Sequence, residues 1–237
     1  LHFNREIEPA TVIRQLRDEQ PTSYLFAIES GEDCFLGASP ERLVKKEKQK
    51  VLSTCLAGSI GRGKTVQKDN ELGNQLLHDN KNLIEHDVVV HMIKEAMIES
   101  CESVYTPSEP VLYKARDIQH LFTPVVGYAK NGVSLLTMVE RLHPTPALGG
   151  FPKEKALEKI REVEILDRGW YAAPIGWIDQ NDDGEFAVAI RSGLIQGKEA
   201  SLFAGCGIVA DSEPVSEYKE TQMKFMPMLS ALGGNES

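Results

Sequence analysis

Glu85 stands at an unexpected position in the segment LIEHDVVVHMIKEAM, residues 83–97. At helical spacing it shares a face with Val89, Met92 and Ala96, which are apolar. The segment EHDVVVH, residues 85–91, resembles a zinc motif but lacks the two histidines, four residues apart, of HExxH. Taken alone, Glu85 is therefore interpreted as a buried acid that accepts hydrogen bonds from the backbone.

A second acidic group lies near the C-terminus. Glu217, Glu220 and Lys224 are spaced three and four residues apart, so they share one face of the helix predicted there. By themselves they fit a solvated charged stripe. Two inward-facing carboxylates from distant helices are, however, what a Mg²⁺ site beside an anionic substrate needs. Such a site would also explain why Glu85 faces inward.

The segment GSIGRGKT, residues 58–65, matches the P-loop pattern GxxxxGK[ST] in full. A P-loop would make Lys64 and Thr65 ligands of phosphate and Mg²⁺. The context argues against it, because the preceding residues alternate like a hairpin strand and the following ones, VQKDNELGN, are polar. A glycine-rich loop after a strand, with amides free to bind another anion, is the competing interpretation.

Two further segments are rich in glycine or proline. HPTPALGGFP, residues 143–152, is typical of a rigid loop. AGCGIV, residues 204–209, places two glycines at the end of a predicted strand, where backbone amides can approach a ligand closely.

The composition is that of a soluble protein. The 237 residues are 41% hydrophobic and 26% charged, with a net charge of −9, which argues against nucleic acid or an anionic membrane as the main partner. No apolar run reaches the roughly 18 residues of a membrane span. The scattered cysteines are expected to be free thiols of a cytoplasmic protein: Cys34, Cys55, Cys101 and Cys206.

The elements that position these residues follow from periodicity and turn signals. Helices are predicted over 8–20, 134–142 and 152–164, and a mostly helical region from about 68 to 99. A last helix is predicted to start near 211, capped by Ser212 or Ser216. Strands are predicted over 22–30, 34–39, 41–47, 49–58, 171–179, 185–195 and 200–210. Strands in hairpins beside separate helices indicate an α+β fold with antiparallel sheet.

Seven motifs occur in order along almost the whole chain: GASPERLV, LAGSIGRG, EHDVVV, LHPTPALGGFP, DRGWYAAPIGW, VAIRSG and FAGCGIVADSEPVSEYKETQMK. Together they resemble the chorismate-utilising enzymes, and most closely the isochorismate synthases, with the menaquinone branch ahead of the siderophore branch. The resemblance implies two antiparallel sheets packed between helical layers, and residues 1–237 as the C-terminal part of a single chorismate-binding domain.

The resemblance also implies a set of site residues. By motif, Glu85 and Glu220 match the family's Mg²⁺ ligands and Glu217 a supporting acid. Substrate binding is implied for Arg191 and Lys224, which with amides near Gly205 would hold a carboxylate of chorismate. Gly58, Ser59 and His120 match positions of the family's pocket, and this replaces the P-loop interpretation.

Glu41 of SPE matches the family's general acid, which protonates the C4 hydroxyl of chorismate as water attacks C2. To hold a proton at neutral pH, its pKa must be raised by burial or by neighbouring carboxylates. Ala147 and Leu148 match the members that use water and stop at isochorismate.

One family feature is missing. The family's general base is a lysine on a strand before the segment LHFNREIEP, and residues 1–40 contain no lysine. The chain is therefore expected to be incomplete at its N-terminus and nearly inactive alone. The alternatives are a binding module without catalysis, another chorismate-utilising enzyme such as a salicylate or anthranilate synthase, and, more remotely, a P-loop protein.

Overall fold

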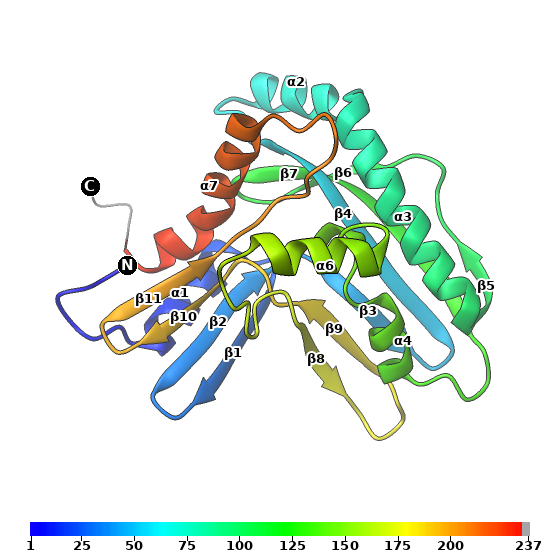
Figure 1. Cartoon of the computed structure of the whole chain (residues 1–237), viewed down its shortest axis with the longest axis horizontal. Coiled ribbons are helices and arrows are strands. Elements are labelled where there is room, and N and C mark those ends of the chain that lie inside the picture. Colours follow the sequence, from blue (N-terminus) through cyan, green and yellow to red (C-terminus); the bar gives the residue numbers. More distant parts are fainter. Residues whose placement is uncertain (234–237) are drawn as a thin grey trace.

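Two antiparallel sheets form the framework of the chain (Figure 1), as a computed structural model that describes residues 1–233 shows. The smaller sheet has the order β1-β2-β10-β11, formed by Tyr24–Ser30, Asp33–Ser39, Ser192–Gln196 and Glu199–Phe203. The larger has the order β5-β7-β4-β3-β9-β8, with β6 also paired to β7. Its strands are β3 Arg42–Glu47, β4 Lys50–Gly61, β5 Cys101–Tyr105, β6 Val111–Lys114, β7 Ile118–Ala129, β8 Pro174–Ile178 and β9 Gly184–Val188. The predicted α+β fold with two antiparallel sheets is confirmed.

The chain passes between the two sheets twice, once between β2 and β3 and once between β9 and β10. The second passage corrects the prediction of one strand over 185–195. Arg191 has a φ of 53°, in the left-handed region, so the backbone cannot continue as one extended strand. The Ala38 amide donates to the Arg191 carbonyl at 3.2 Å, which ties the two passages together.

Each sheet has its own helices. Helices α1, Pro9–Glu19, and α7, Pro214–Ala231, pack together on the smaller sheet. Helix α3, Asn80–Ser100, runs along β4 and β7 of the larger sheet, and α4, Leu135–Leu142, packs against β3 and α3. The remaining helices are α2 Val66–Leu77, α5 Pro146–Gly149 and α6 Lys153–Val163. None of the helices within residues 1–233 has the length and apolar character needed to cross a lipid bilayer.

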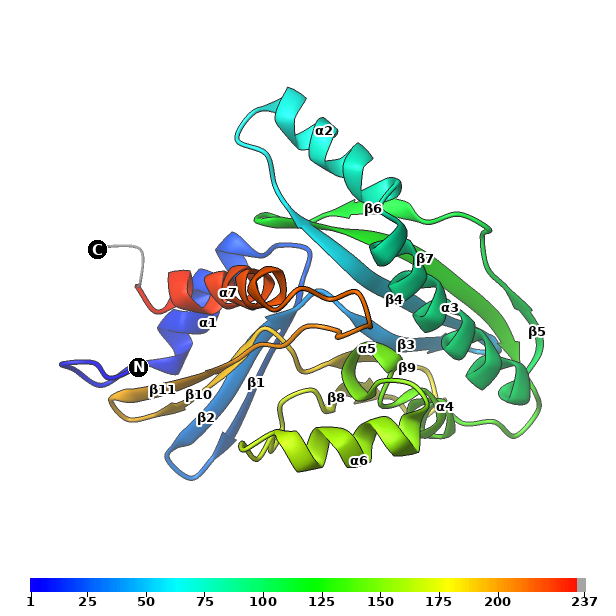
Figure 2. The same ribbon diagram turned by 45° about the horizontal axis from the view of Figure 1, so that its top comes forward.

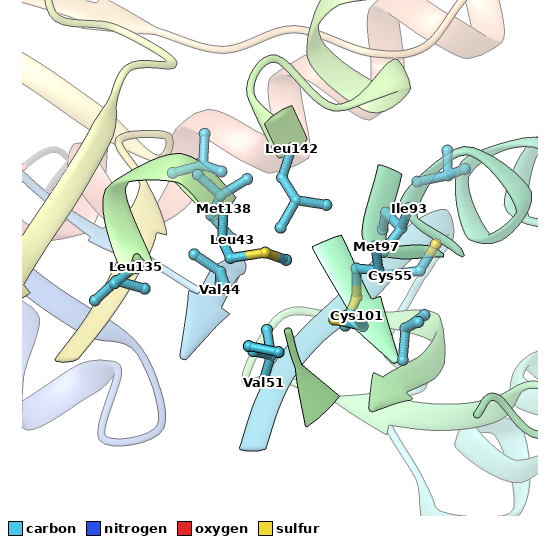
Figure 3. Close-up of a cluster of buried hydrophobic side chains, with 14 of the residues drawn as sticks. Leu43, Val44, Val51, Cys55, Ile93, Met97, Cys101, Leu135, Met138 and Leu142 are labelled. Carbon is cyan, nitrogen blue, oxygen red and sulfur yellow. The ribbon is translucent and has the colours of Figure 1, made fainter. Parts of the chain in front are cut away.

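The largest buried cluster lies between the larger sheet and helices α3 and α4 (Figure 3). Ile93 and Met97 of α3 meet Leu135, Met138 and Leu142 of α4 over the strands that carry Leu43, Val44 and Val51. Truncation of one such side chain to alanine typically costs about 2–5 kcal/mol. A separate cluster joins α1 and α7 to the smaller sheet through Val12, Leu16, Leu36, Ile195 and Met228.

Strand β7, which is as long as β4, was not predicted, nor were β5 and β6. Pro124 stands in the middle of β7, where a proline argues against a central strand. The structure resolves this conflict through the neighbouring strands: β5 ends opposite Val126, and β6 begins opposite Phe122. Pro124 therefore faces the gap between them, where no strand needs its missing amide, and its carbonyl accepts from Thr106 Oγ1 at 3.2 Å.

The start of α7 also differs from the prediction. Glu213 is the N-cap residue, without a side-chain capping bond, and Pro214 occupies the first helical position. Ser212 Oγ instead accepts from the Val209 amide at 3.1 Å, in the preceding loop. Ser212 and Ser216 were predicted as caps from their residue type alone. The helix instead begins at Pro214, because proline is favoured at the first helical position.

Candidate active site

A pocket of about 1020 Å³, including its open mouth, is lined by residues of both passages between the sheets, Glu41 and Arg191 among them. Figure 2 shows how the two sheets and helices α3, α5 and α7 are arranged. It brings together all the predicted site residues except Glu217, from segments far apart in the sequence. These are Glu41, Gly58, Ser59, Glu85, His120, Ala147, Leu148, Arg191, Gly205, Glu220 and Lys224. The buried Glu217 lies one helical turn from Glu220 on α7.

Glu85 is partly buried on α3, beside the buried stripe of His86, Val89, Ile93 and Met97 rather than at its centre. Burial, together with the nearby charge of Glu220, raises the pKa of Glu85 to about 7. Within residues 1–233 its carboxylate makes no hydrogen bond or ion pair. The interpretation of Glu85 as an acid satisfied by the backbone is therefore wrong.

The two acids of α7 do have cationic partners. Glu220 forms an ion pair with Lys224 at 2.7 Å, and Glu217 forms one with Lys81 of α3. Lys224 also donates to the Gly205 carbonyl at 2.9 Å. With the side chains so placed, no group of three or more His, Cys, Asp or Glu residues in the described part of the chain is arranged to hold a metal ion.

Gly207, in the loop after β11, keeps the space beside Glu85 open. A Cβ at this position would stand 2.7 Å from Glu85 Oε1. Any residue other than glycine would therefore push the carboxylate away from its present position.

Glu41 lies in the first passage between the sheets and is only 6% exposed. Burial raises the pKa of its carboxyl to about 7, although the charges of Lys224 and Arg191 oppose the shift. Its carboxyl group has no hydrogen-bond partner within residues 1–233. A buried carboxyl of this kind can hold a proton near neutral pH and donate it to a bound molecule.

Arg191 lies in the second passage and is 7% exposed. Burial lowers the pKa of its guanidinium to about 10, which still leaves it charged at neutral pH. Among the described residues no carboxylate or carbonyl accepts a hydrogen bond from it. A buried cation without a partner is costly unless an anion completes the site, so Arg191 is suited to bind a carboxylate in two parallel hydrogen bonds.

Ser59 and His120 form a pair on adjacent strands, with Ser59 Oγ 2.9 Å from His120 Nδ1. A bulge in β4 between Ala57 and Ser59, with Gly58 at a φ of 76°, turns Ser59 into this position. Burial lowers the pKa of His120 well below its ordinary value, and the charges of Arg191 and Lys224 add to the effect. The imidazole is therefore neutral at pH 7.

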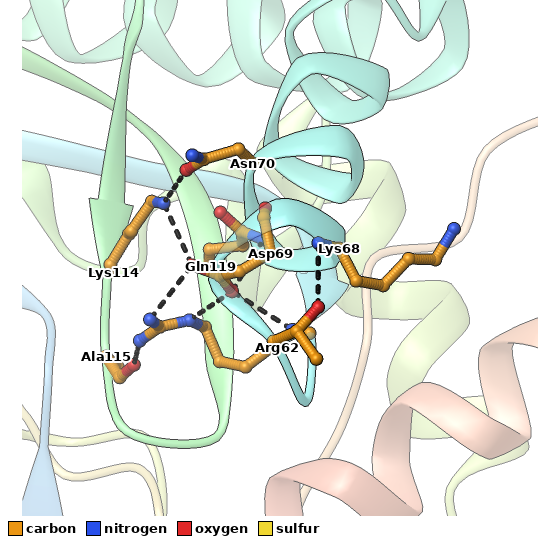
Figure 4. A network of polar contacts seen from close by, with 9 residues as sticks. Arg62, Lys68, Asp69, Asn70, Lys114, Ala115 and Gln119 are labelled. Carbon is orange, nitrogen blue, oxygen red and sulfur yellow. Dashed lines mark hydrogen bonds and ion pairs between the residues drawn. The ribbon is translucent and has the colours of Figure 1, made fainter.

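The P-loop interpretation of residues 58–65 is excluded. Gly58–Gly61 belongs to β4, and residues 59–61 pair antiparallel with residues 118–120 of β7. Asp69 of α2 takes the amide of Gly63 at 3.0 Å and the guanidinium of Arg62 at 2.6 and 3.0 Å (Figure 4). Thr65 caps α2 by accepting from Lys68 N. The Asp69 carboxylate thus already accepts a hydrogen bond from the Gly63 amide, which a bound phosphate would need.

The pocket also contains residues that sequence reasoning did not single out. Tyr171 stacks on Phe203, with ring centroids 5.4 Å apart, and Arg168 forms an ion pair with Glu164 at 2.5 Å at the pocket wall. Beneath the pocket, the buried His86 lies 2.7 Å from Thr123 Oγ1, which fixes α3 to β7. Tyr171 and Arg168 lie within the DRGWYAAPIGW motif. The sequence analysis therefore identified this segment but assigned no role to the two residues.

Comparison with known proteins gives consistent matches. A family model described as chorismate binding enzyme matches residues 1–233. The chain is 59% identical over 234 residues to isochorismate synthase MenF of Bacillus subtilis, covering 99% of the chain and 50% of that protein. It is 46% identical to the salicylate biosynthesis isochorismate synthase of Pseudomonas aeruginosa, covering 97% of the chain and 49% of that protein.

Among solved structures, the chain resembles a putative 2,3-dihydroxybenzoate-specific isochorismate synthase, DhbC, from Bacillus anthracis. The TM-score is 0.94 at 38% identity, over 98% of this chain and 64% of that one. The chain thus spans about half the length of the two curated relatives.

Proposed function

Because this chain belongs to the family of chorismate-binding enzymes, we propose that it carries the substrate pocket of an isochorismate synthase. The main support is that motif residues from the larger sheet, from both passages between the sheets, from the loop after β11 and from α3, α5 and α7 line one pocket. Residues 1–237 would form part of a single chorismate-binding domain. The relatives include a menaquinone-specific isochorismate synthase from Escherichia coli and a vibriobactin-specific one from Vibrio cholerae. We keep the menaquinone branch as the first expectation.

The reaction moves a hydroxyl group around the ring. A bond forms between C2 of chorismate and a water oxygen, the double bonds shift, and the C4–oxygen bond breaks. The attacking water gives up one proton to a general base, which the family places on the strand that precedes the segment LHFNREIEP. The departing hydroxyl takes one proton and leaves as water, so the atoms balance. Glu41 supplies the second proton, because a buried carboxyl with a pKa of about 7 is protonated in part of the molecules at neutral pH.

Arg191 and Lys224 would hold one carboxylate of chorismate, with the backbone near Gly205. Arg191 has no acceptor among residues 1–233, and Lys224 donates to the Gly205 carbonyl. His120 and Ser59, as a neutral pair, together with Gly58 would contact the ring. Ala147 and Leu148 of α5 line the pocket and would favour water over other nucleophiles.

The donor set fits Mg²⁺. Carboxylate oxygens are its preferred protein ligands, and Glu85, Glu220 and Glu217 repel one another enough to contribute to the raised pKa of Glu85. Glu85 and Glu220 would hold the ion, and Glu217 would support it through a water. When bound, Mg²⁺ would neutralise these acids and bind the ring carboxylate of chorismate.

A non-catalytic binding module is the second candidate. It is favoured by the lack of any lysine in residues 1–40 that could act as the family's general base. Salicylate and anthranilate synthases remain alternatives within the family.

The test measures chorismate consumption and identifies the product by chromatography. It uses the chain itself and a chimaera in which the chain replaces the matching half of the Bacillus subtilis relative. Isochorismate from the chimaera supports the proposal, whereas salicylate or anthranilate would assign another family member. Chorismate binding by calorimetry without turnover in either protein supports the binding module. Absence of both binding and turnover refutes both candidates.

A further inference from the structure

A second and smaller cavity lies directly behind the substrate pocket. Pro40, His120 and Arg191 line both cavities, so they form the shared wall. Gln20 at the end of α1 and Asp117 in the turn between β6 and β7 line the small cavity only. The space open to the centre of a water molecule is about 20 Å³, and roughly 10–15 Å³ is enough for one water.

Two buried polar atoms belong to residues of this cavity and have no partner within residues 1–233. They are Nε2 of Gln20 and Nε2 of His120. Gln20 is 8% exposed and His120 is 4% exposed, so bulk solvent does not satisfy either atom. Buried polar atoms in folded proteins are nearly always hydrogen-bonded to protein or to ordered water.

The guanidinium nitrogens of Arg191 are not among these fully buried atoms, but they too have no hydrogen-bond acceptor among the described residues. Its guanidinium carries five N–H donors, and a substrate carboxylate held in two parallel bonds takes only two of them. The described residues accept none of the remaining donors. The wall between the cavities therefore contains a cation with donors to spare, beside two further atoms without partners.

We propose that the small cavity holds one ordered water molecule that links Gln20 to Arg191 and His120. The water accepts from Gln20 Nε2 and from Arg191, and donates to His120 Nε2 and toward the carboxylate of Asp117. This direction requires the tautomer of His120 in which Nδ1 carries the proton and donates toward Ser59 Oγ, which leaves Nε2 as the acceptor. Four polar groups around one water match the usual environment of a buried water.

Gln20 is then a positioning residue. It does not touch the substrate but holds, through the water, the rear of Arg191 and His120 while their front edges face the pocket. The role in substrate binding rests on the proposed function, whereas the presence of the water does not. The two parts of the inference can therefore be tested separately.

The first test is a crystal structure of the chain at a resolution that shows ordered water, for the parent and for Gln20→Met. Methionine has a similar length and no amide. We expect a water within hydrogen-bond distance of Gln20 Nε2 and of Arg191 in the parent, and its loss in the variant. An empty cavity in the parent, or a direct bond between Gln20 and Arg191 in place of the water, would overturn the proposal.

The second test measures chorismate affinity by calorimetry for the parent, Gln20→Met and the control Gln15→Met. Gln15 lies on the same helix but is exposed, so its replacement leaves the cavity intact. We expect the affinity of Gln20→Met to fall about three- to tenfold, as for the loss of one hydrogen bond, and that of Gln15→Met to stay unchanged. Equal affinities in all three proteins would refute the positioning role. If the parent bound no chorismate, the proposed function would fail, and the crystal structure would still decide whether the water exists.

Discussion

The backbone carbonyl of Glu41 accepts a hydrogen bond from the amide of Val188 at 3.1 Å. Glu41 lies where the chain passes from the smaller sheet to the larger one, and Val188 ends the strand after which the chain passes back. The two passages are therefore held side by side. Because Arg191 lies in the second passage, the proposed proton donor and the proposed carboxylate anchor are positioned by the same backbone contact.

Replacing the proposed acid tests its chemical role. We expect Glu41→Gln in the chimaera to lower turnover of chorismate by about 100-fold or more, because glutamine cannot donate a proton to the leaving hydroxyl. Binding should be retained, since the amide fills the same space. Steady-state kinetics with calorimetric affinities measure both quantities. The control is Glu47→Gln, an exposed position at the far end of β3; equal turnover in the two variants would contradict the role of Glu41.

The raised pKa of Glu41 predicts a pH dependence of stability. Between the ordinary value of 4.5 and the folded value of about 7, the folded state holds a proton that the unfolded chain has lost. This contribution to the free energy of unfolding is thus full below about pH 4.5 and is lost as the pH rises through 7.

Glu41→Gln lacks this titration, so its stability relative to the parent should improve with rising pH. We expect a gain of up to about 3 kcal/mol, from roughly 1.4 kcal/mol per unit of pKa shift. Urea unfolding of both proteins at pH 5 and pH 8 measures the difference. The same difference at both pH values would show that Glu41 titrates normally.

Removing one acid of the proposed metal site should weaken metal binding without loss of fold. We expect Glu85→Gln and Glu220→Gln each to weaken Mg²⁺ binding in the presence of chorismate by at least about tenfold. Calorimetric titration with Mg²⁺ checks this, with Glu95→Gln, an exposed acid of the same helix, as the control. Glu85→Gln should unfold no more easily than the parent without Mg²⁺, because a neutral amide costs less to bury than a carboxylate. Unchanged Mg²⁺ titrations in both variants would refute the assignment.

Gly207 provides a test of carboxylate position. A Cβ in Gly207→Ala would stand 2.7 Å from Glu85 Oε1, so we expect the flexible end of Glu85 to move aside. Thermal stability should be nearly unchanged, while Mg²⁺ affinity falls by about tenfold.

The matched control is Gly61→Ala, whose Cβ would meet Met223 Sδ at 3.4 Å, an ordinary contact. If Gly207→Ala and Gly61→Ala bound Mg²⁺ with equal affinity, the position of the Glu85 carboxylate would not matter for binding of the ion.

Local patterns predicted the helices and hairpins well, because their signals are contained within short segments. The helix predicted over 152–164 is observed as Lys153–Val163, and the hairpin of β3 and β4 lies where charged turn residues indicated it. Long-range pairing was not predictable in the same way. Pro124 is compatible with a central strand only because its two outer neighbours leave a gap opposite it, and Arg191 breaks a continuous apolar pattern by its backbone angle.

The candidate site was predicted from motifs rather than from spacing. Glu85 was the exception, because a carboxylate beside an apolar helix stripe indicated a buried site before any motif was considered. Gln20 and His86 could not be identified, because a lone buried glutamine or histidine carries meaning only once its neighbours from other strands are known. The chemical roles of the pocket residues remain predictions until the variants are measured.

The separate cores of the two sheets have a consequence for the lifetime of the folded molecule. A ligand held between Glu41 and Arg191 touches both passages at once, so neither half can open while it stays bound. Opening must wait for its release, and saturating ligand lowers the frequency of opening in proportion to its occupancy. Resistance to proteases should then follow the concentration of the ligand, which under the proposed function is chorismate.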